Sequence, residues 1–241
     1  TGDNFKLRLT NGKVSLPSGA TLYFVEGTMT ATNLVPPLTP AVINVRGRGK
    51  ASAFLELLDH KPLGLVSKSN FDPARLSGDG TVDIKFDIPM QPGLRGDQVK
   101  ISASAKLDNA TFRNIAKGMD VTGGSFRLGF GDAEISATGP AKIDGTPVNL
   151  SWTRRLAKNG ADSDEIIVKA TLDDKRRGKL GIDLSEYLTG PVPMQIKAVT
   201  RAGKIDGVNV EADLSKVAMR LGRIHWTREP VKGTRASFDV D

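Results

Sequence analysis

Cysteine is absent from the 241 residues, which excludes disulfide bonds, thiolate metal sites and cysteine nucleophiles. Histidine occurs twice, as His60 and His225, too few for a zinc site with several ligands. No Gly-x-Ser-x-Gly elbow is present. Aromatic residues make up 5% of the chain and alternate in phase with aliphatic ones. Proteins that bind single-stranded nucleic acid instead expose aromatic side chains on which the bases stack. We therefore expect no enzyme, no cofactor, no metal site and no nucleic-acid partner.

Long apolar runs are also missing. No stretch of about 18 apolar residues occurs, so nothing in the sequence is expected to span a bilayer. The hydrophobic fraction of 39% still suffices for a folded core, because apolar residues recur along almost the whole chain. The sequence opens Thr1-Gly2-Asp3, with neither Met nor a basic-then-apolar leader. We expect an internal segment of a longer protein, whose targeting or anchoring parts lie elsewhere.

The charge balance is moderately basic. Lys and Arg number 34 against 27 Asp and Glu, which gives +7 and a pI near 9.6. Such a balance suits anionic membranes or nucleic acid. The densest basic runs are Arg154-Arg155 and Lys175-Arg176-Arg177, and the remaining cations are dispersed. We interpret these charges as a solvated basic surface.

Alternation of apolar and polar residues is the dominant pattern. Val82-Asp83-Ile84-Lys85-Phe86-Asp87-Ile88 puts four apolar residues on one side of an extended chain and three charges on the other. Similar runs begin near residues 5, 99, 126, 148, 168, 192 and 208. Continuous apolar runs between long helices are instead typical of parallel sheets. The sequence predicts a mainly β fold, an elongated, curled antiparallel sheet with a groove or trough and a few short helices.

Turns and short helices complete the expected architecture. Asn11-Gly12, Asp144-Gly145 and Asp206-Gly207 are typical of two-residue hairpins, because both positions tolerate positive φ. Residues 51–60 have helical apolar spacing before Pro62, and Asp72-Pro73 resembles a helix start.

The chain shows a faint internal echo. Leu76-Ser77-Gly78 and Leu188-Thr189-Gly190 each precede an alternating strand, and residues 105–108 resemble 212–215. We therefore interpret residues 1–241 as one β-rich segment, with a possible duplication over about 1–110 and 111–241. Chance similarity between alternating strands would produce the same echo.

An apolar sheet face of this extent has to be covered, and two arrangements satisfy that need. The first is a β-sandwich or a sheet covered by its own helices, as in a non-enzymatic structural or interaction module of an envelope assembly protein. The second is a sheet curled into a trough that shelters lipid acyl chains. Small aliphatic residues suit such a lining better than a tight binding site.

Several segments resemble the central region of YhdP-type members of the AsmA-like family. These are the helix with Leu57-Leu58-Asp59-His60-Lys61-Pro62-Leu63, then Phe71-Asp72-Pro73, Ser77-Gly78-Asp79-Gly80, residues 139–148, 180–184 and 188–192, and Ile224-His225-Trp226. The likeness covers most of residues 45–241. Its motifs are Gly, Pro and turn patterns, and it contains no catalytic signature.

The resemblance implies a protein of the Gram-negative envelope. It would be anchored in the inner membrane by an N-terminal helix, extend a β-sheet through the periplasm and support phospholipid movement toward the outer membrane. The implied partners are phospholipid acyl chains and, through other parts of the chain, both membranes. The residues expected to line the lipid path are Val82, Ile84, Phe86, Ile101, Ala103, Phe126, Leu128, Leu150, Val168, Ala170, Ile196 and Ala198.

Overall fold

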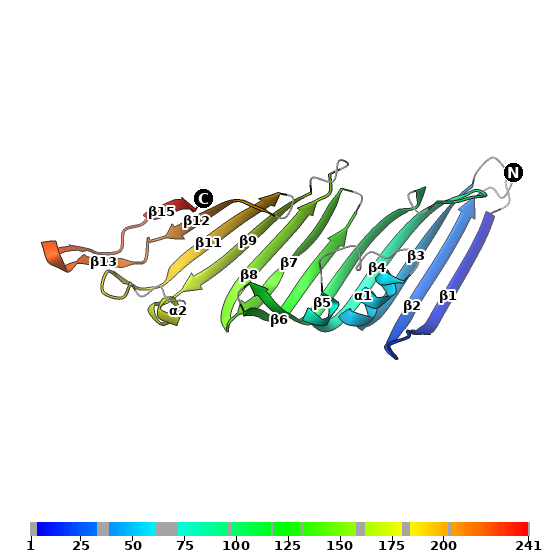
Figure 1. Ribbon diagram of the computed structural model, residues 1–241, viewed down its shortest axis with the longest axis horizontal. Helices are drawn as coiled ribbons and strands as arrows, with labels where there is room; N and C mark the ends of the chain where they lie inside the picture. The colour runs from blue at the N-terminus through cyan, green and yellow to red at the C-terminus, as the bar shows by residue number, and fades with distance from the viewer. Residues whose placement is uncertain are drawn as a thin grey trace. The chain divides into compact units, whose positions relative to one another are not determined.

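A computed structural model describes residues 4–32, 39–60, 72–95, 98–116, 118–131, 133–157, 162–179, 184–201 and 204–240 (Figure 1). Most of these residues form antiparallel β-strands, and the large sheet is not closed. The expected fold class, mainly β with few short helices, is confirmed.

The strands follow the chain order almost without interruption. The large sheet has twelve strands in the order β1-β2-β3-β4-β5-β6-β7-β8-β9-β11-β12-β15. Its bounds are β1 Asn4–Ser15, β2 Thr21–Thr32, β3 Thr39–Lys50, β4 Leu76–Met90, β5 Lys100–Ala116, β6 Met119–Phe130, β7 Glu134–Ile143, β8 Thr146–Arg155, β9 Ser163–Leu172, β11 Val192–Arg201, β12 Lys204–Asp213 and β15 Arg235–Val240. A second sheet has three short strands, β10 Leu188–Thr189, β13 Ala218–Leu221 and β14 Trp226–Arg228.

The chain divides into two compact units, Thr1–Ala137 and Thr138–Asp241. The division lies inside β7. The suggested duplication of the sequence stays a prediction, and each unit is described by itself below.

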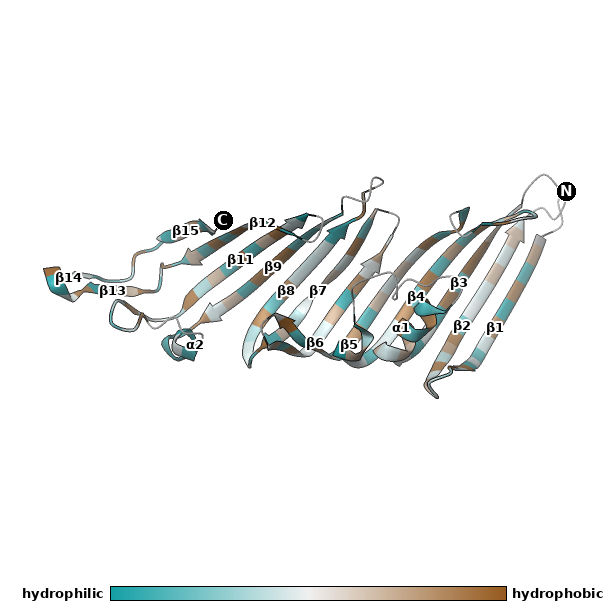
Figure 2. Cartoon of the chain, in the orientation of Figure 1, coloured by the Kyte–Doolittle hydropathy of each residue, from teal (hydrophilic) through white to brown (hydrophobic). Residues whose placement is uncertain are grey.

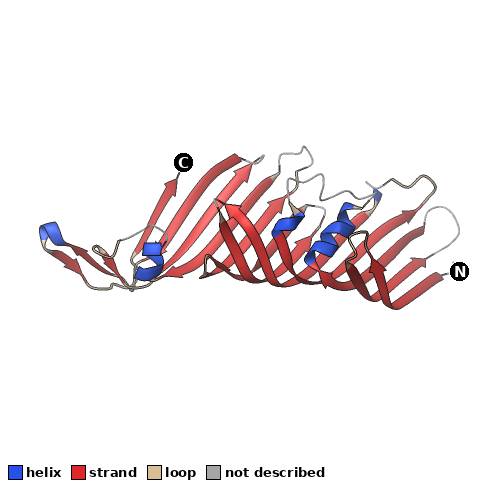
Figure 3. Cartoon of the chain, turned by 60° about the horizontal axis from the view of Figure 1, so that its bottom comes forward, coloured by secondary structure: helices blue, strands red, loops and turns tan. Residues whose placement is uncertain are grey.

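Unit 1 contains a helix, α1 (Ala51–Asp59), that confirms the helical spacing of residues 51–60. It packs across β2, β3 and β4 (Figure 3). A Cβ added at Gly47 or Gly80 would lie 3.6 Å and 3.2 Å from the ring of Phe54, so these glycines leave room for that ring on the sheet. Beside it, Leu16, Leu22 and Ala53 form a small buried core.

The predicted helix start at Asp72 is also confirmed. A short 3₁₀ turn, η1 (Pro73–Arg75), follows it, and the Asp72 carboxylate accepts a hydrogen bond from the Ala74 N–H at 3.0 Å. Proline at the first helical position has no N–H to leave unpaired.

Unit 2 contains a second short helix, α2 (Asp174–Lys179). Arg177 is buried in it and donates hydrogen bonds to the carbonyl oxygens of Leu172, Leu188 and Gly190 at 3.0, 3.0 and 2.8 Å. Arg177 therefore ties the helix to the end of β9 and to the start of the next strands. The interpretation of its basic run as solvated surface is wrong for this residue.

One of the three hairpin predictions is confirmed. Asp144 and Gly145 join β7 to β8 with φ values of 46° and 79°, as a type I′ turn requires. The prediction at Asn11-Gly12 is wrong, because Asn11 adopts a φ of 56° inside β1 and the chain reverses later, between Leu16 and Ala20. Asp206-Gly207 likewise lies inside β12, and the reversal falls between the paired residues Arg201 and Lys204.

The echoed triplets occupy similar backbone positions. Gly78 and Gly190 have φ values of 143° and 117°. A Cβ on Gly78 would lie 2.9 Å from the carbonyl oxygen of Asp108, and one on Gly190 would lie 2.8 Å from that of Lys216. Each glycine permits a close approach of two backbone segments within its own unit.

Neither unit has a second sheet packed face to face onto its main sheet among the described residues. In unit 1 the packing partners of the sheet are α1 and η1, and in unit 2 α2 contacts β9. The sandwich arrangement is therefore not what the described strands form. In unit 1, α1 lies on the face that carries Val82, because its Phe54 ring sits against Gly47, the residue that pairs with Val82.

Candidate functional site

The register in unit 1 brings seven of the predicted lining residues onto one face. Phe86 pairs with Ile101 and Ile84 pairs with Ala103, while Val82 pairs with Ala105. Directly opposed residues of antiparallel strands share a face. Further pairs extend this face to β6, through Ala105 with Leu128 and Leu107 with Phe126. We call it the apolar face of unit 1, and its predicted members are Val82, Ile84, Phe86, Ile101, Ala103, Phe126 and Leu128.

The other five predicted residues share a face of unit 2. Leu150 pairs with Val168, and Val168 pairs with Ile196. Ala170 and Ala198 lie two residues away on the same strands and therefore on the same side. We call this the apolar face of unit 2. Figure 2 shows the alternation as hydrophobic and hydrophilic bands along the strands.

The predicted lining residues differ in how far their side chains are exposed to solvent. Ile196 is 39% exposed, and most of the others are half-buried, so their side chains remain partly open to solvent. Phe126 is 2% exposed, and its ring lies against Phe112 with centroids 5.9 Å apart. A Cβ added at Gly124 would lie 2.2 Å from the Phe126 ring, which shows that the ring covers this glycine. Phe126 thus belongs to the packing of the sheet itself.

The register adds residues that the predicted lining omits. Leu7 pairs with Met29, Met29 with Ile43 and Ile43 with Phe86, which extends the apolar face of unit 1 to β1. In unit 2, Val210 lies between Ile196 and Phe238. Leu7 and Phe238 are both exposed. Alternation in the strands that begin near residues 5 and 208 carried the signal, but only strand pairing shows which face each residue joins.

The opposite face of unit 1 carries paired charges. Arg46 binds Asp83 at 2.6 Å, Lys50 binds Asp79 at 2.6 Å and Arg8 binds Glu26 at 2.7 Å. The hydrogen bond with Asp83 raises the pKa of Arg46 above its usual value. These pairs link neighbouring strands on the wet side. Exposed pairs of this kind contribute little to stability, because water screens them.

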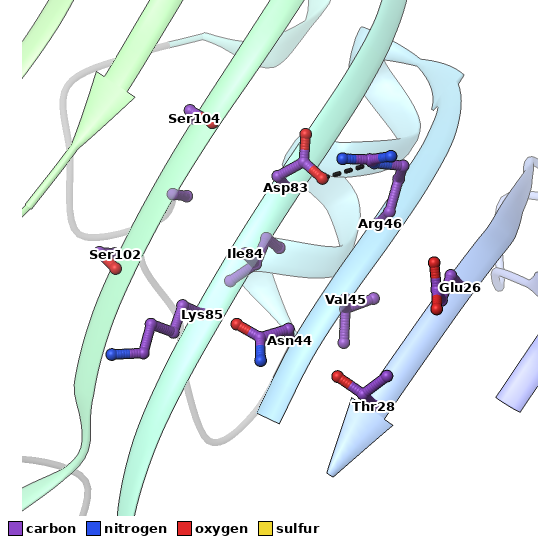
Figure 4. A pocket seen from close by; sticks show the side chains of 11 residues that line it. Glu26, Thr28, Asn44, Val45, Arg46, Asp83, Ile84, Lys85, Ser102 and Ser104 are labelled. Carbon is purple, nitrogen blue, oxygen red and sulfur yellow. Dashed lines mark hydrogen bonds and ion pairs between the residues drawn. The ribbon is translucent and has the colours of Figure 1, made fainter. Parts of the chain in front are cut away.

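A shallow hollow of about 650 Å³ lies on this polar face (Figure 4). Its polar side chains come from two cross-strand rows, and α1 lies behind the strands in this view. The lining side chains that share the polar face are Glu26, Thr28, Asn44, Arg46, Asp83, Lys85, Ser102 and Ser104. The hollow is thus on the side away from the apolar face. Its two acidic and two basic side chains, Glu26, Asp83, Arg46 and Lys85, balance in charge.

A polar network ends the apolar face of unit 2. The Asp164 carboxylate accepts hydrogen bonds from Nε of Arg154 at 2.8 Å, from Nε1 of Trp152 at 3.0 Å and from Oγ1 of Thr200 at 3.1 Å. Arg154 pairs with Asp164 across β8 and β9, two residues beyond the pair of Trp152 and Ile166 and therefore on the same face. The Arg154 hydrogen bond, with smaller contributions from Trp152 and Thr200, holds the pKa of Asp164 below its usual value. The network fixes the ends of three strands.

No group of three or more His, Cys, Asp or Glu that could hold a metal ion occurs in the part of the chain that the structure describes. Within the same part, no helix is both long enough and apolar enough to cross a bilayer.

Comparisons with family models, with curated proteins and with solved structures find no match for this chain.

Proposed function

We propose that the apolar faces of the open sheet shelter lipid acyl chains, in a protein that supports phospholipid transport between the inner and outer membranes of a cell envelope. The observation that carries this proposal is a set of partly exposed apolar side chains on one face of each unit, with no second sheet packed onto it among the described residues. The envelope setting rests on the likeness of the Gly, Pro and turn patterns to AsmA-like proteins.

The energetics favour acyl chains as the covering material. Each CH₂ group removed from water contributes about 0.8 kcal/mol, so a chain of about 16 carbons faces a cost on the order of 13 kcal/mol in water. An aliphatic strip along several strands removes much of that cost. It does so without directional contacts, which would hold a moving lipid in one place.

The polar face supports the same function from the other side. Its cross-strand ion pairs keep one side of a single-layer sheet wetted while the other side is apolar. One face of such a single-layer sheet thus stays hydrated, while the other face is left for acyl chains.

Photocrosslinking from the sheet tests the proposal. A photoreactive amino acid at Ile84 or Ile196 lies on an apolar face. One at Lys85 or Lys169 lies on the opposite, polar face of the sheet. The protein is incubated with phospholipid vesicles, irradiated and examined by mass spectrometry. We expect phospholipid adducts at Ile84 and Ile196 and few at the two lysines.

Two results would contradict the proposal. Equal labelling at all four positions would show non-selective contact with lipid. Protein adducts at Ile84 and Ile196 without lipid adducts would favour the interaction module instead.

In a full-length protein, Ile84→Asp should reduce lipid transport more than Lys85→Asp, provided that both variants fold.

A further inference from the structure

A short hairpin in unit 2 projects away from the main sheet. Strands β13 and β14 are joined by a 3₁₀ turn, η3 (Gly222–Ile224), and β13 pairs on its other side with β10 (Figures 1 and 3). His225 closes the turn with a φ of 51°. All residues from Arg220 to Thr227 are exposed. We call residues 220–227 the hairpin tip.

The hairpin tip exposes large apolar side chains. Ile224 is 69% exposed at the turn. Leu221 and Trp226 are directly paired across β13 and β14, so they share a face, and both are exposed. Three large apolar groups at one projecting end are not explained by packing within unit 2. A Trp beside aliphatic residues is typical of groups that sit at a membrane–water interface.

The charge of the same region is strongly one-sided. Residues 216–232 contain Lys216, Arg220, Arg223, Arg228 and Lys232 against a single acidic residue, Glu229. This segment therefore carries +4 of the net +7 of the chain. Among the described residues, no ion pair joins Arg220 or Arg223 to a carboxylate, in contrast to the paired cations of unit 1. Arg220 and Arg223 directly precede Leu221 and Ile224 in the sequence, and their guanidinium groups are available to anions.

We propose that the hairpin tip docks onto the surface of a bilayer that contains anionic lipids, with Ile224 and Trp226 entering the interface while Arg220 and Arg223 contact the headgroups. Apolar insertion and attraction between basic groups and anionic lipids are the two contributions that hold interfacial segments. The combination of exposed apolar and basic side chains favours an anionic bilayer as the partner of the hairpin tip, because a neutral surface would leave the cations uncompensated. The inference does not rest on lipid in the main sheet, since it concerns other residues and another surface.

Vesicle flotation tests the docking. The whole chain is mixed with vesicles of phosphatidylcholine alone or of equal amounts of phosphatidylglycerol and phosphatidylcholine. We expect binding to the mixed vesicles that weakens as salt is raised. Each basic group near an anionic surface contributes about fivefold in affinity, so Arg220→Glu with Arg223→Glu should weaken binding on the order of 25-fold or more. Lys142→Glu with Lys169→Glu, on exposed residues of β7 and β9, is the charge-matched control.

Fluorescence provides a second readout. In a Trp152→Phe background Trp226 is the remaining tryptophan, and its emission should shift to shorter wavelength with the mixed vesicles. Ile224→Ser should reduce both the shift and the binding. Absence of binding by the unmodified protein, or an equal loss in the control pair, would overturn the proposal.

Discussion

Replacement of Arg177 by methionine should destabilise unit 2 strongly. Its side chain is 4% exposed, and the guanidinium donates to three backbone carbonyls besides its ion pair with Asp174. Methionine retains part of the aliphatic stem but supplies no donor. Breaking a buried charged network of this kind costs about 3–5 kcal/mol, because the carbonyls are left without partners.

Arg176→Met is the matched control for this change. Arg176 is the neighbouring residue of α2, but its side chain is 39% exposed and its ion pair with Asp173 lies at the surface. Loss of that pair should cost about 0–1 kcal/mol. The two substitutions alter composition identically, so any difference between them reports the burial of Arg177.

Urea denaturation followed by tryptophan fluorescence measures the difference. Trp152 and Trp226, the two tryptophans of the chain, both lie in unit 2. With a slope of about 2 kcal/mol per molar urea, Arg177→Met should lower the midpoint by about 1.5–2.5 M and Arg176→Met by less than about 0.5 M. Equal shifts for the two variants would refute the assignment of Arg177 as a buried tie between β9 and the following strands.

Three further substitutions, one of them a control, test the sheet. Gly124→Ala should destabilise unit 1 by about 1–3 kcal/mol, because its Cβ would lie 2.2 Å from the Phe126 ring, while Gly207→Ala, with no atom within 4 Å, should be nearly neutral by thermal unfolding. The lowered pKa of Asp164 means that its bond with Arg154 stabilises the fold above the usual carboxylate pKa and is lost as pH falls through the folded-state value. Asp164→Asn should therefore reduce the difference in melting temperature between neutral and acidic pH, and an unchanged difference would contradict this.

Periodicity predicted the faces well, because a strand has only two sides. Once residues 82–88 alternate, Ile84 and Phe86 must lie together whatever strand comes next. The helix at residues 51–60 followed from its spacing in the same way. The order of the strands and the lack of a second layer could not be derived, since the same alternation is compatible with a sandwich or with an open sheet.

Turn and charge patterns predicted less, for a different reason. An Asn-Gly pair shows that positive φ is tolerated, but whether the chain reverses there depends on neighbouring strands, and at Asn11 the strand continues. A run such as Lys175-Arg176-Arg177 does not show which cation is buried, because that depends on carbonyls contributed by residues 172, 188 and 190. Both errors arise from contacts distant in sequence.

The choice between the two faces of the sheet as a binding surface follows from energy rather than from shape. The polar face of unit 1 carries a shallow hollow, yet the charges of that hollow already have partners, and covering it would desolvate Arg46 and Asp83 without adding new ones. The apolar faces offer the opposite balance. A large aliphatic side chain such as Ile196, which is 39% exposed, gains on the order of 1 kcal/mol on full burial and leaves no polar group unsatisfied when an acyl chain covers it. Under the proposed function, a ligand that is mostly hydrocarbon is therefore expected on the apolar faces.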